Sequence, residues 1–163
     1  MTGAATVPWS WNGNDAAGRP MAQGTYRVHA SVRRSDGNDW VRTADVAVDR
    51  TRPSPSWMGT SLSSFNPYPD GYRDTIDLRF RPAEAAVSGH VNVYDAVGRK
   101  VWTSATFGAT SPSAIKAVRF AGRSSAGRLL ASGRYAFTVT LTDRAGLVGG
   151  SRKQGFGLDA RRR

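Results

Sequence analysis

The sequence of 163 residues contains no cysteine, only one glutamate and no long apolar run. The lack of cysteine excludes disulfides and thiolate metal sites, so the fold must be stabilised by packing. No segment is apolar for long enough to cross a membrane as a helix. The first residues, MTGAATVPWSW, lack the basic leader and apolar stretch of a signal peptide. If the protein is exported, we therefore expect its signal to lie upstream of this chain.

Residues able to do chemistry are also scarce. His29 and His90 both fall on the outward phase of expected strands, and Glu84 falls in a loop after a proline. No serine has the G-x-S-x-G setting of a nucleophile. The segment Gly122–Gly127 has the glycines of a phosphate loop, but it lacks the lysine and the following helix. The sequence therefore predicts a protein that is not an enzyme and that holds no cofactor.

What is abundant favours strands. The chain has 18 glycines and 8 prolines, and it shows no extended helical periodicity. Near the C-terminus, apolar residues alternate with polar ones in the period of two that is typical of a half-buried strand. The inward residues of this strand are Tyr135, Phe137, Val139 and Leu141. We therefore predict an all-β fold with little helix.

The chain also repeats itself. Residues 11–37 align without a gap on residues 120–146, at a constant offset of 109. Matched positions include Trp11 and Phe120, Gly13 and Gly122, Gly18 and Gly127, Gly24 and Gly133, Tyr26 and Tyr135, and Gly37 and Gly146. An offset of this length suits one immunoglobulin-sized β-sandwich of roughly 100 residues.

The repeat predicts how the chain is divided. Only ten residues precede Trp11, whereas about 65 residues of strand-like sequence precede the equivalent Phe120 within its module. We therefore predict a tandem repeat of immunoglobulin/fibronectin-III-like antiparallel β-sandwiches with a truncated first copy. The expected parts are the C-terminal portion of a first module (1–52), a linker (53–55), a complete module (56–157) and a basic tail (158–163).

Strands are expected throughout both parts. In the first part they are Thr6–Trp11, followed by a hairpin of Thr25–Arg34 and Trp40–Val48. In the complete module they are Trp57–Ser64, Thr75–Arg81, His90–Tyr94, Arg99–Thr106, Ile115–Phe120, the alternating strand above and Leu147–Phe156. The inward residues of the truncated copy, Trp11, Tyr26, Val28 and Val32, are expected to lie against a neighbouring module, against another chain or in the open.

Four motifs follow one another in the complete module. They are F-N-P-x-x-D-G-x-x-D-T at 65–75, V-Y-D-x-x-G-R-x-V at 93–101, S-S-A-G-R-x-x-A-S-G-x-Y at 124–135 and T-D-x-A-G at 142–146. In this order they resemble the bacterial immunoglobulin-like domain of the flagellar hook-capping protein type. Such domains occur in tandem on secreted and surface proteins. The resemblance implies a non-catalytic module that spaces, docks or assembles at the C-terminus of an extracellular or cell-surface protein, next to upstream modules of the same polypeptide.

The loop that opens the module is a weak calcium candidate. In similar modules it commonly reads P-N-G-D-G-x-x-D, whose oxygens could bind a hard cation. Here Tyr68 and Pro69 replace the N-G pair, which leaves the side-chain oxygens of Asn66, Asp70 and Asp74. We expect a plain Pro/Gly turn and no metal.

Charge is the strongest remaining signal. The formal net charge is +11, and most of the excess lies in the second part of the chain. The candidate polyanion-binding residues are Arg99, Lys100, Lys116, Arg119, Arg123, Arg128, Arg134, Arg152 and Lys153. A basic surface attracts polyanions in a salt-dependent way. Three explanations are compatible with it, in falling order of preference: an ordinary solvated surface, retention on an anionic cell-wall polymer such as teichoic acid or an acidic polysaccharide, and nucleic-acid binding.

Two binding alternatives remain open. Nucleic acid is the less favoured polyanion, because the aromatic residues are mostly spent on the core phase and form no evident stacking platform. A carbohydrate-binding module would need an exposed aromatic row, for which the candidates are Trp40, Trp57, Trp102 and Tyr94. The sequence does not decide which of these side chains face outward.

Overall fold

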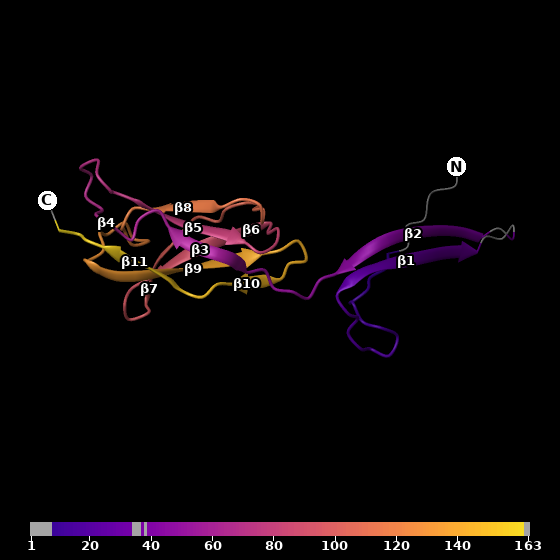
Figure 1. Cartoon of the computed structure of the whole chain (residues 1–163). Coiled ribbons are helices and arrows are strands. Elements are labelled where there is room, and N and C mark those ends of the chain that lie inside the picture. Colours follow the sequence, from indigo (N-terminus) through magenta and orange to yellow (C-terminus); the bar gives the residue numbers. More distant parts are fainter. Residues whose placement is uncertain (1–7, 34–36, 38, 162–163) are drawn as a thin grey trace. The chain divides into compact units, whose positions relative to one another are not determined.

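The computed structural model describes residues 8–33, 37 and 39–161, and these form strands and loops without a helix (Figure 1). The chain divides into two compact units, Met1–Arg50 and Thr51–Arg163. The prediction of an all-β fold is therefore confirmed.

The smaller unit is built on one hairpin. Strands β1 (Gly24–Arg33) and β2 (Asp39–Val48) pair antiparallel along their whole length, from Gly24 opposite Val48 to Arg33 opposite Asp39. The hairpin was predicted from the alternation on either side of a turn. Val32 at its far end is 53% exposed, so part of the apolar face of this unit is open.

The first predicted strand is wrong where the structure describes it. Residues 8–12 are not a strand, and Thr6 lies outside the described residues. Trp11 is instead held by local contacts. Its Nε1 donates to the carbonyl oxygen of Asn14 at 2.6 Å, and its ring meets Tyr26 edge-on with the centroids 5.8 Å apart. These contacts anchor the segment as a loop.

The larger unit contains two sheets. One has the order β3-β5-β8, formed by β3 (Pro55–Thr60), β5 (Ile76–Pro82) and β8 (Lys116–Phe120). The other has the order β4-β11-β9-β6-β7, with β10 also paired to β9. Its members are β4 (Ser64–Phe65), β6 (Ser88–Tyr94), β7 (Lys100–Thr103), β9 (Gly133–Thr142), β10 (Val148–Gly150) and β11 (Gln154–Leu158). All pairings are antiparallel except that of β4 with β11.

The two sheets enclose one core, as in a β-sandwich. The inward residues of β5 and of β9 were predicted from their alternation, and all of them are buried; Tyr135 is 9% exposed and the others have no exposed surface. These fully buried residues are Ile76, Leu78 and Phe80 from β5 and Phe137, Val139 and Leu141 from β9. Figure 1 shows β5 and β8 on one side of this unit and β9 and β10 on the other.

Three predicted strands are interrupted or shorter. The expected strand Trp57–Ser64 divides into β3 and β4, which belong to different sheets, and Leu147–Phe156 divides into β10 and β11. The strand predicted to run to Thr106 ends as β7 at Thr103. There the Oγ of Ser104, rather than a backbone group, accepts a hydrogen bond from the amide of Val91 at 3.0 Å. The amide of Ser104 still donates to the carbonyl of Val91 at 2.9 Å, so the side chain replaces one backbone bond of the pair.

One five-residue turn recurs four times. Two backbone hydrogen bonds close the turn: the amide of the first residue donates to the carbonyl of the fifth, and the amide of the fourth donates to the carbonyl of the first. In a third bond, the amide of the fifth residue donates to the side-chain oxygen of the first. The fourth residue is always a glycine with φ between 76° and 86°, a conformation that other residues rarely adopt. The turns are Asp15–Arg19, Asp95–Arg99, Ser124–Arg128 and Asp143–Leu147.

A tyrosine closes the loop before a long strand in each unit. The hydroxyl of Tyr26 donates to the carbonyl of Ala22 at 2.8 Å, just after β1 begins. The hydroxyl of Tyr135 donates to the carbonyl of Ala131 at the same distance, just after β9 begins. Both bonds span four residues, so each fixes the path by which the chain enters the strand.

Candidate basic surface

Three of the nine predicted basic residues gather on the outer face of the larger sheet. Lys100 of β7 lies directly opposite Tyr94 of β6, and the Nζ of Lys153 lies 4.8 Å from the centre of the Tyr94 ring. Arg134 lies two residues before Ala136, which pairs with Tyr94 from the other side. Side chains two residues apart on a strand share a face. We call this group, Tyr94, Lys100, Arg134 and Lys153, the Tyr94 surface.

The sheet that carries the Tyr94 surface has no acidic strand residue. None of its six strands contains an aspartate or a glutamate. The acid that follows β6, Asp95, is bound by Arg99, with 2.8 Å between Nε and Oδ2. Desolvation opposes ionisation of Asp95, but the hydrogen bonds from Arg99 outweigh it and lower the pKa. Arg99, one of the predicted residues, therefore neutralises a turn carboxylate and adds no net charge.

The other predicted residues are spread elsewhere. Lys116 and Arg119 lie on β8 in the opposite sheet. The Nζ of Lys116 is 5.5 Å from the centre of the Phe107 ring, and the Nε of Arg119 is 3.7 Å from Asp77 Oδ1. The nine residues therefore do not form one continuous surface.

Arg123 and Arg128 lie at the turn that follows β8. The Nη1 of Arg123 donates to the carbonyl of Gly127 at 3.1 Å, so this side chain stabilises its own turn. Arg152 lies in the link between β10 and β11, where it lines a pocket of about 390 Å³ together with Trp57.

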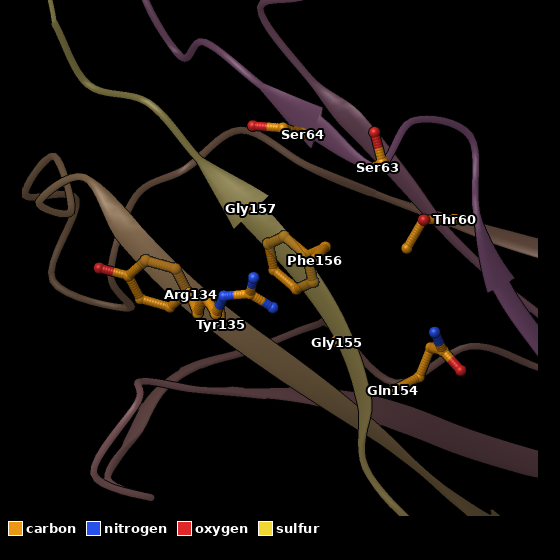
Figure 2. Close-up of a pocket in the computed structure, with 9 residues that line it drawn as sticks. All are labelled: Thr60, Ser63, Ser64, Arg134, Tyr135, Gln154, Gly155, Phe156 and Gly157. Carbon is orange, nitrogen blue, oxygen red and sulfur yellow. The ribbon is translucent and has the colours of Figure 1, made fainter.

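An open pocket of about 610 Å³ adjoins the Tyr94 surface at Arg134 (Figure 2). One part of the pocket wall has no side chains, because it is formed by Gly155 and Gly157 of β11. Ser63 and Ser64 lie on one side of these glycines, and Arg134 lies on the other. Arg134 makes no ion pair with any residue that the structure describes. A guanidinium beside hydroxyl groups and free of a carboxylate suits an anionic ligand.

The three calcium candidates serve the loop itself. Asn66 Oδ1 accepts the amide of Tyr68 at 3.1 Å, and Asp70 Oδ1 accepts the amide of Tyr72 at 2.9 Å. Asp74 Oδ2 accepts the amide of Gly71 at 3.0 Å. These oxygens therefore act as turn acceptors.

The four aromatic candidates differ in exposure. Trp102 is partly buried and packs against the core, with its ring centroid 5.0 Å from that of Phe120. Tyr94 is half-buried beneath Lys153. Trp40 is 51% exposed, with the guanidinium of Arg42 4.4 Å from its ring centre. Trp57 is 44% exposed.

Sequence reasoning missed two arginines beside Trp57. Arg81 of β5 lies directly opposite Trp57 of β3, and Arg79 lies directly opposite Gly59. The alternation of β5 signals that Arg79 faces outward, but it does not tell which strand pairs beside it. The contribution of these arginines therefore becomes evident only from the register of β3 and β5.

The two histidines lie apart from any group of metal ligands among the described residues. His29 is exposed and His90 is half-buried, both on outer faces. No group of three histidine or acidic residues among them could hold a metal ion. Within the same residues, no helix is long and apolar enough to cross a membrane.

The comparisons with known proteins give information about the fold only. No family model and no curated protein matches the sequence. Among solved structures, the chain is similar to dimeric latent PorU from Porphyromonas gingivalis, with a TM-score of 0.52 and 16% sequence identity. The match covers 88% of this chain but 13% of that one. At this identity, the likeness supports a shared all-β architecture and carries no activity from that protein to this chain.

Proposed function

We propose that the larger unit is an immunoglobulin/fibronectin-III-like module and that the smaller unit is the C-terminal part of a second copy. The strand order supports the first statement, because a sheet of three strands faces a sheet that contains β6, β7, β9 and β11. The Tyr135 hydroxyl also bonds back to the backbone at the start of a long strand, as the tyrosine corner of this fold does.

Equivalent local contacts support the duplication. The bridge between Asn14 and Pro20 has a counterpart between Arg123 and Leu129, exactly where the offset of 109 puts it. The amide of Met21 donates to the carbonyl of Gly13 as that of Leu130 does to Gly122, at 2.9 Å in both. The two tyrosine hydroxyl bonds also differ by 109 residues at both ends. Local hydrogen bonding therefore agrees with the alignment of the sequences.

The proposed function is non-catalytic docking or spacing at the C-terminus of an exported or cell-surface bacterial protein. Upstream modules of the same polypeptide would carry its other activities. The basic unit would be retained on an anionic cell-envelope polymer. The observation that supports this role is the Tyr94 surface, which places three cations on a sheet whose strands contain no acid. Such a field attracts polyanions and weakens with added salt.

A salt titration tests this function. The full chain is mixed with wall teichoic acid or with an acidic polysaccharide, and bound protein is measured by co-sedimentation. We expect retention near 50 mM salt that falls steeply as salt rises. The double variant Arg134→Gln with Lys153→Gln should lose most of its retention on teichoic acid.

The matched control removes the same charge from other places. Arg42→Gln with Arg144→Gln changes two exposed arginines outside the Tyr94 surface, and it should bind nearly as the parent does. Equal losses in the two double variants would show an effect of net charge alone. Tighter binding to single-stranded DNA than to either polymer would favour the nucleic-acid alternative.

A further inference from the structure

A second exposed surface lies on the outer face of the three-stranded sheet. The six-membered ring of Trp57 lies against Gly59, two residues further along β3, so closely that a Cβ at residue 59 would lie 2.7 Å from Cζ2. Only glycine therefore allows the indole to lie flat along the strand. Arg81 is directly opposite Trp57, and Arg79 is directly opposite Gly59. We call Trp57, Gly59, Arg79 and Arg81 the Trp57 platform.

Covering a glycine is a structural role that aromatic side chains have in sheets. That role explains the ring face that rests on Gly59. It does not account for the other ring face: Trp57 remains 44% exposed, in a unit where most aromatic rings pack into the core and Tyr72 is 52% exposed. The exposed ring face is available to a flat apolar partner.

The charges around the platform are mostly positive. Arg81 makes no ion pair with any described residue. Arg79 Nη2 lies 3.2 Å from Asp77 Oδ2, and Arg119 Nε lies 3.7 Å from Asp77 Oδ1. One carboxylate is thus shared by two arginines while a third stays free. The face retains excess positive charge directly beside the indole ring.

Hydroxyl and amide groups border the platform. The pocket of about 390 Å³ beside Trp57 is also lined by Ser56, Ser151, Arg152 and Gln154. A ligand lying on the indole could extend into this pocket and exchange hydrogen bonds there. Aromatic stacking beside short polar side chains suits a sugar ring, whose faces carry C–H groups and whose edge carries hydroxyls.

We propose that the Trp57 platform binds an acidic polysaccharide, a polymer of pyranose rings that carry carboxylates. The indole stacks on one ring, and the planar guanidinium of Arg81 forms paired hydrogen bonds with a carboxylate of the polymer. The platform is on the sheet opposite the Tyr94 surface and uses none of its residues. Binding at the Trp57 platform is therefore a separate proposal from retention through the Tyr94 surface, and either can fail without the other.

Alginate, a polymer of hexuronic acids, is the probe, with neutral dextran and polyphosphate beside it. Binding is measured by calorimetry and by tryptophan fluorescence at moderate salt, on the full chain that carries Arg134→Gln and Lys153→Gln, so that the Tyr94 surface does not contribute. We expect alginate to bind more tightly than either of the other polymers. Trp57→Ala and Arg81→Gln should each weaken alginate binding by about tenfold, because each removes one direct contact.

The controls separate stacking from charge and from misfolding. Trp40→Ala removes an equally exposed indole from the smaller unit, and Arg144→Gln removes an exposed arginine from the turn after β9. Neither should change alginate binding. Trp57→Phe should retain part of the affinity, and Arg81→Lys should bind less tightly than the parent. Thermal unfolding identifies any variant that has lost its fold.

Three results would overturn the proposal. If Trp57→Ala bound alginate as tightly as the parent, the Trp57 platform would not be the alginate-binding site. If polyphosphate or single-stranded DNA bound as tightly as alginate, the interaction would depend on charge alone. If neutral dextran bound as tightly as alginate, the carboxylates of the polymer would have no role in binding.

Discussion

At the scale of single residues, short-range hydrogen bonds fix the loops that lead into the strands. Tyr135 is 9% exposed, and its hydroxyl finds its partner four residues back, at Ala131. The first residues of the five-residue turns work in the same way, since each uses its own side-chain oxygen on a nearby amide. The sequence contains enough information for these contacts, because partners and positive-φ glycines are close together along the chain.

Tyr135→Phe should destabilise the larger unit by about 1 kcal/mol, because it removes one hydrogen bond and leaves the ring in place. Chemical denaturation followed by fluorescence measures the change. Tyr26→Phe is the matched control. It removes the equivalent bond in the smaller unit and should leave the transition of the larger unit where it was.

Asp159 should titrate far below an ordinary aspartate. Hydrogen bonds from the side chain and then the amide of Arg161 lower its pKa from 3.8 to about 2. Because the folded pKa is below the unfolded one, the ion pair stabilises the fold above pH 3.8 and ceases to do so as the pH falls through about 2. An NMR titration of the Asp159 carboxyl measures the midpoint. In Arg161→Gln it should move back toward 3.8, and an unchanged midpoint would exclude Arg161 as the cause.

At the scale of strands, the sequence was most informative where a strand has a polar and an apolar side. The alternation located β1, β2, β5 and β9 and named the inward residues of β1, β5 and β9. It failed where strand continuity depends on distant partners. Nothing near Ser64 in the sequence indicates that β4 will leave the strand before it and pair in parallel with β11, almost a hundred residues later. A break of this kind is a tertiary effect.

The pairing of β4 with β11 needs a glycine at one position of β11. A Cβ at residue 157 would lie 3.1 Å from Ser64 Cβ and 2.9 Å from its Oγ, whereas a Cβ at residue 155 would meet nothing closer than 3.8 Å. Gly157→Ala should therefore destabilise the larger unit by about 1 to 2 kcal/mol through overpacking. Gly155→Ala should be nearly neutral. Equal midpoints for both variants in thermal unfolding would contradict this account.

At the scale of the whole molecule, the two units differ in how completely they are packed. The larger unit has its own core between two sheets. The smaller unit is a hairpin with a loop, and a lone hairpin is only marginally stable in water. Its unpaired strand edges are templates for association.

Residues 51–163 expressed alone should therefore keep their fold and unfold at the temperature seen for this unit in the full chain. Residues 1–52 expressed alone should be loosely ordered or self-associating. Hydrogen exchange and sedimentation distinguish these states. Monomeric behaviour of the short fragment with uniformly slow exchange over residues 25–48 would contradict the expectation.

The candidate sites were only partly predictable because they combine distant parts of the chain. The count of basic residues included Lys100, Arg134 and Lys153, but only the pairing of β6 with both β7 and β9 brings them around Tyr94. Arg79 and Arg81 were not among the predicted basic candidates, because only the register of β3 with β5 puts them beside Trp57. A sequence shows how many charges a segment has, whereas the register between strands decides which of them are neighbours.

The tyrosine hydroxyl bond has a kinetic consequence. Tyr135 and Ala131 are four residues apart, so closing their loop costs little chain entropy, whereas β9 must search a long stretch of chain for β6. The Tyr135 hydrogen bond can therefore form during synthesis, before the two sheets of the larger unit pack together. The corresponding bond of Tyr26 can form without any opposite sheet. The direction in which β1 and β9 leave their loops would then be set before these strands find distant partners.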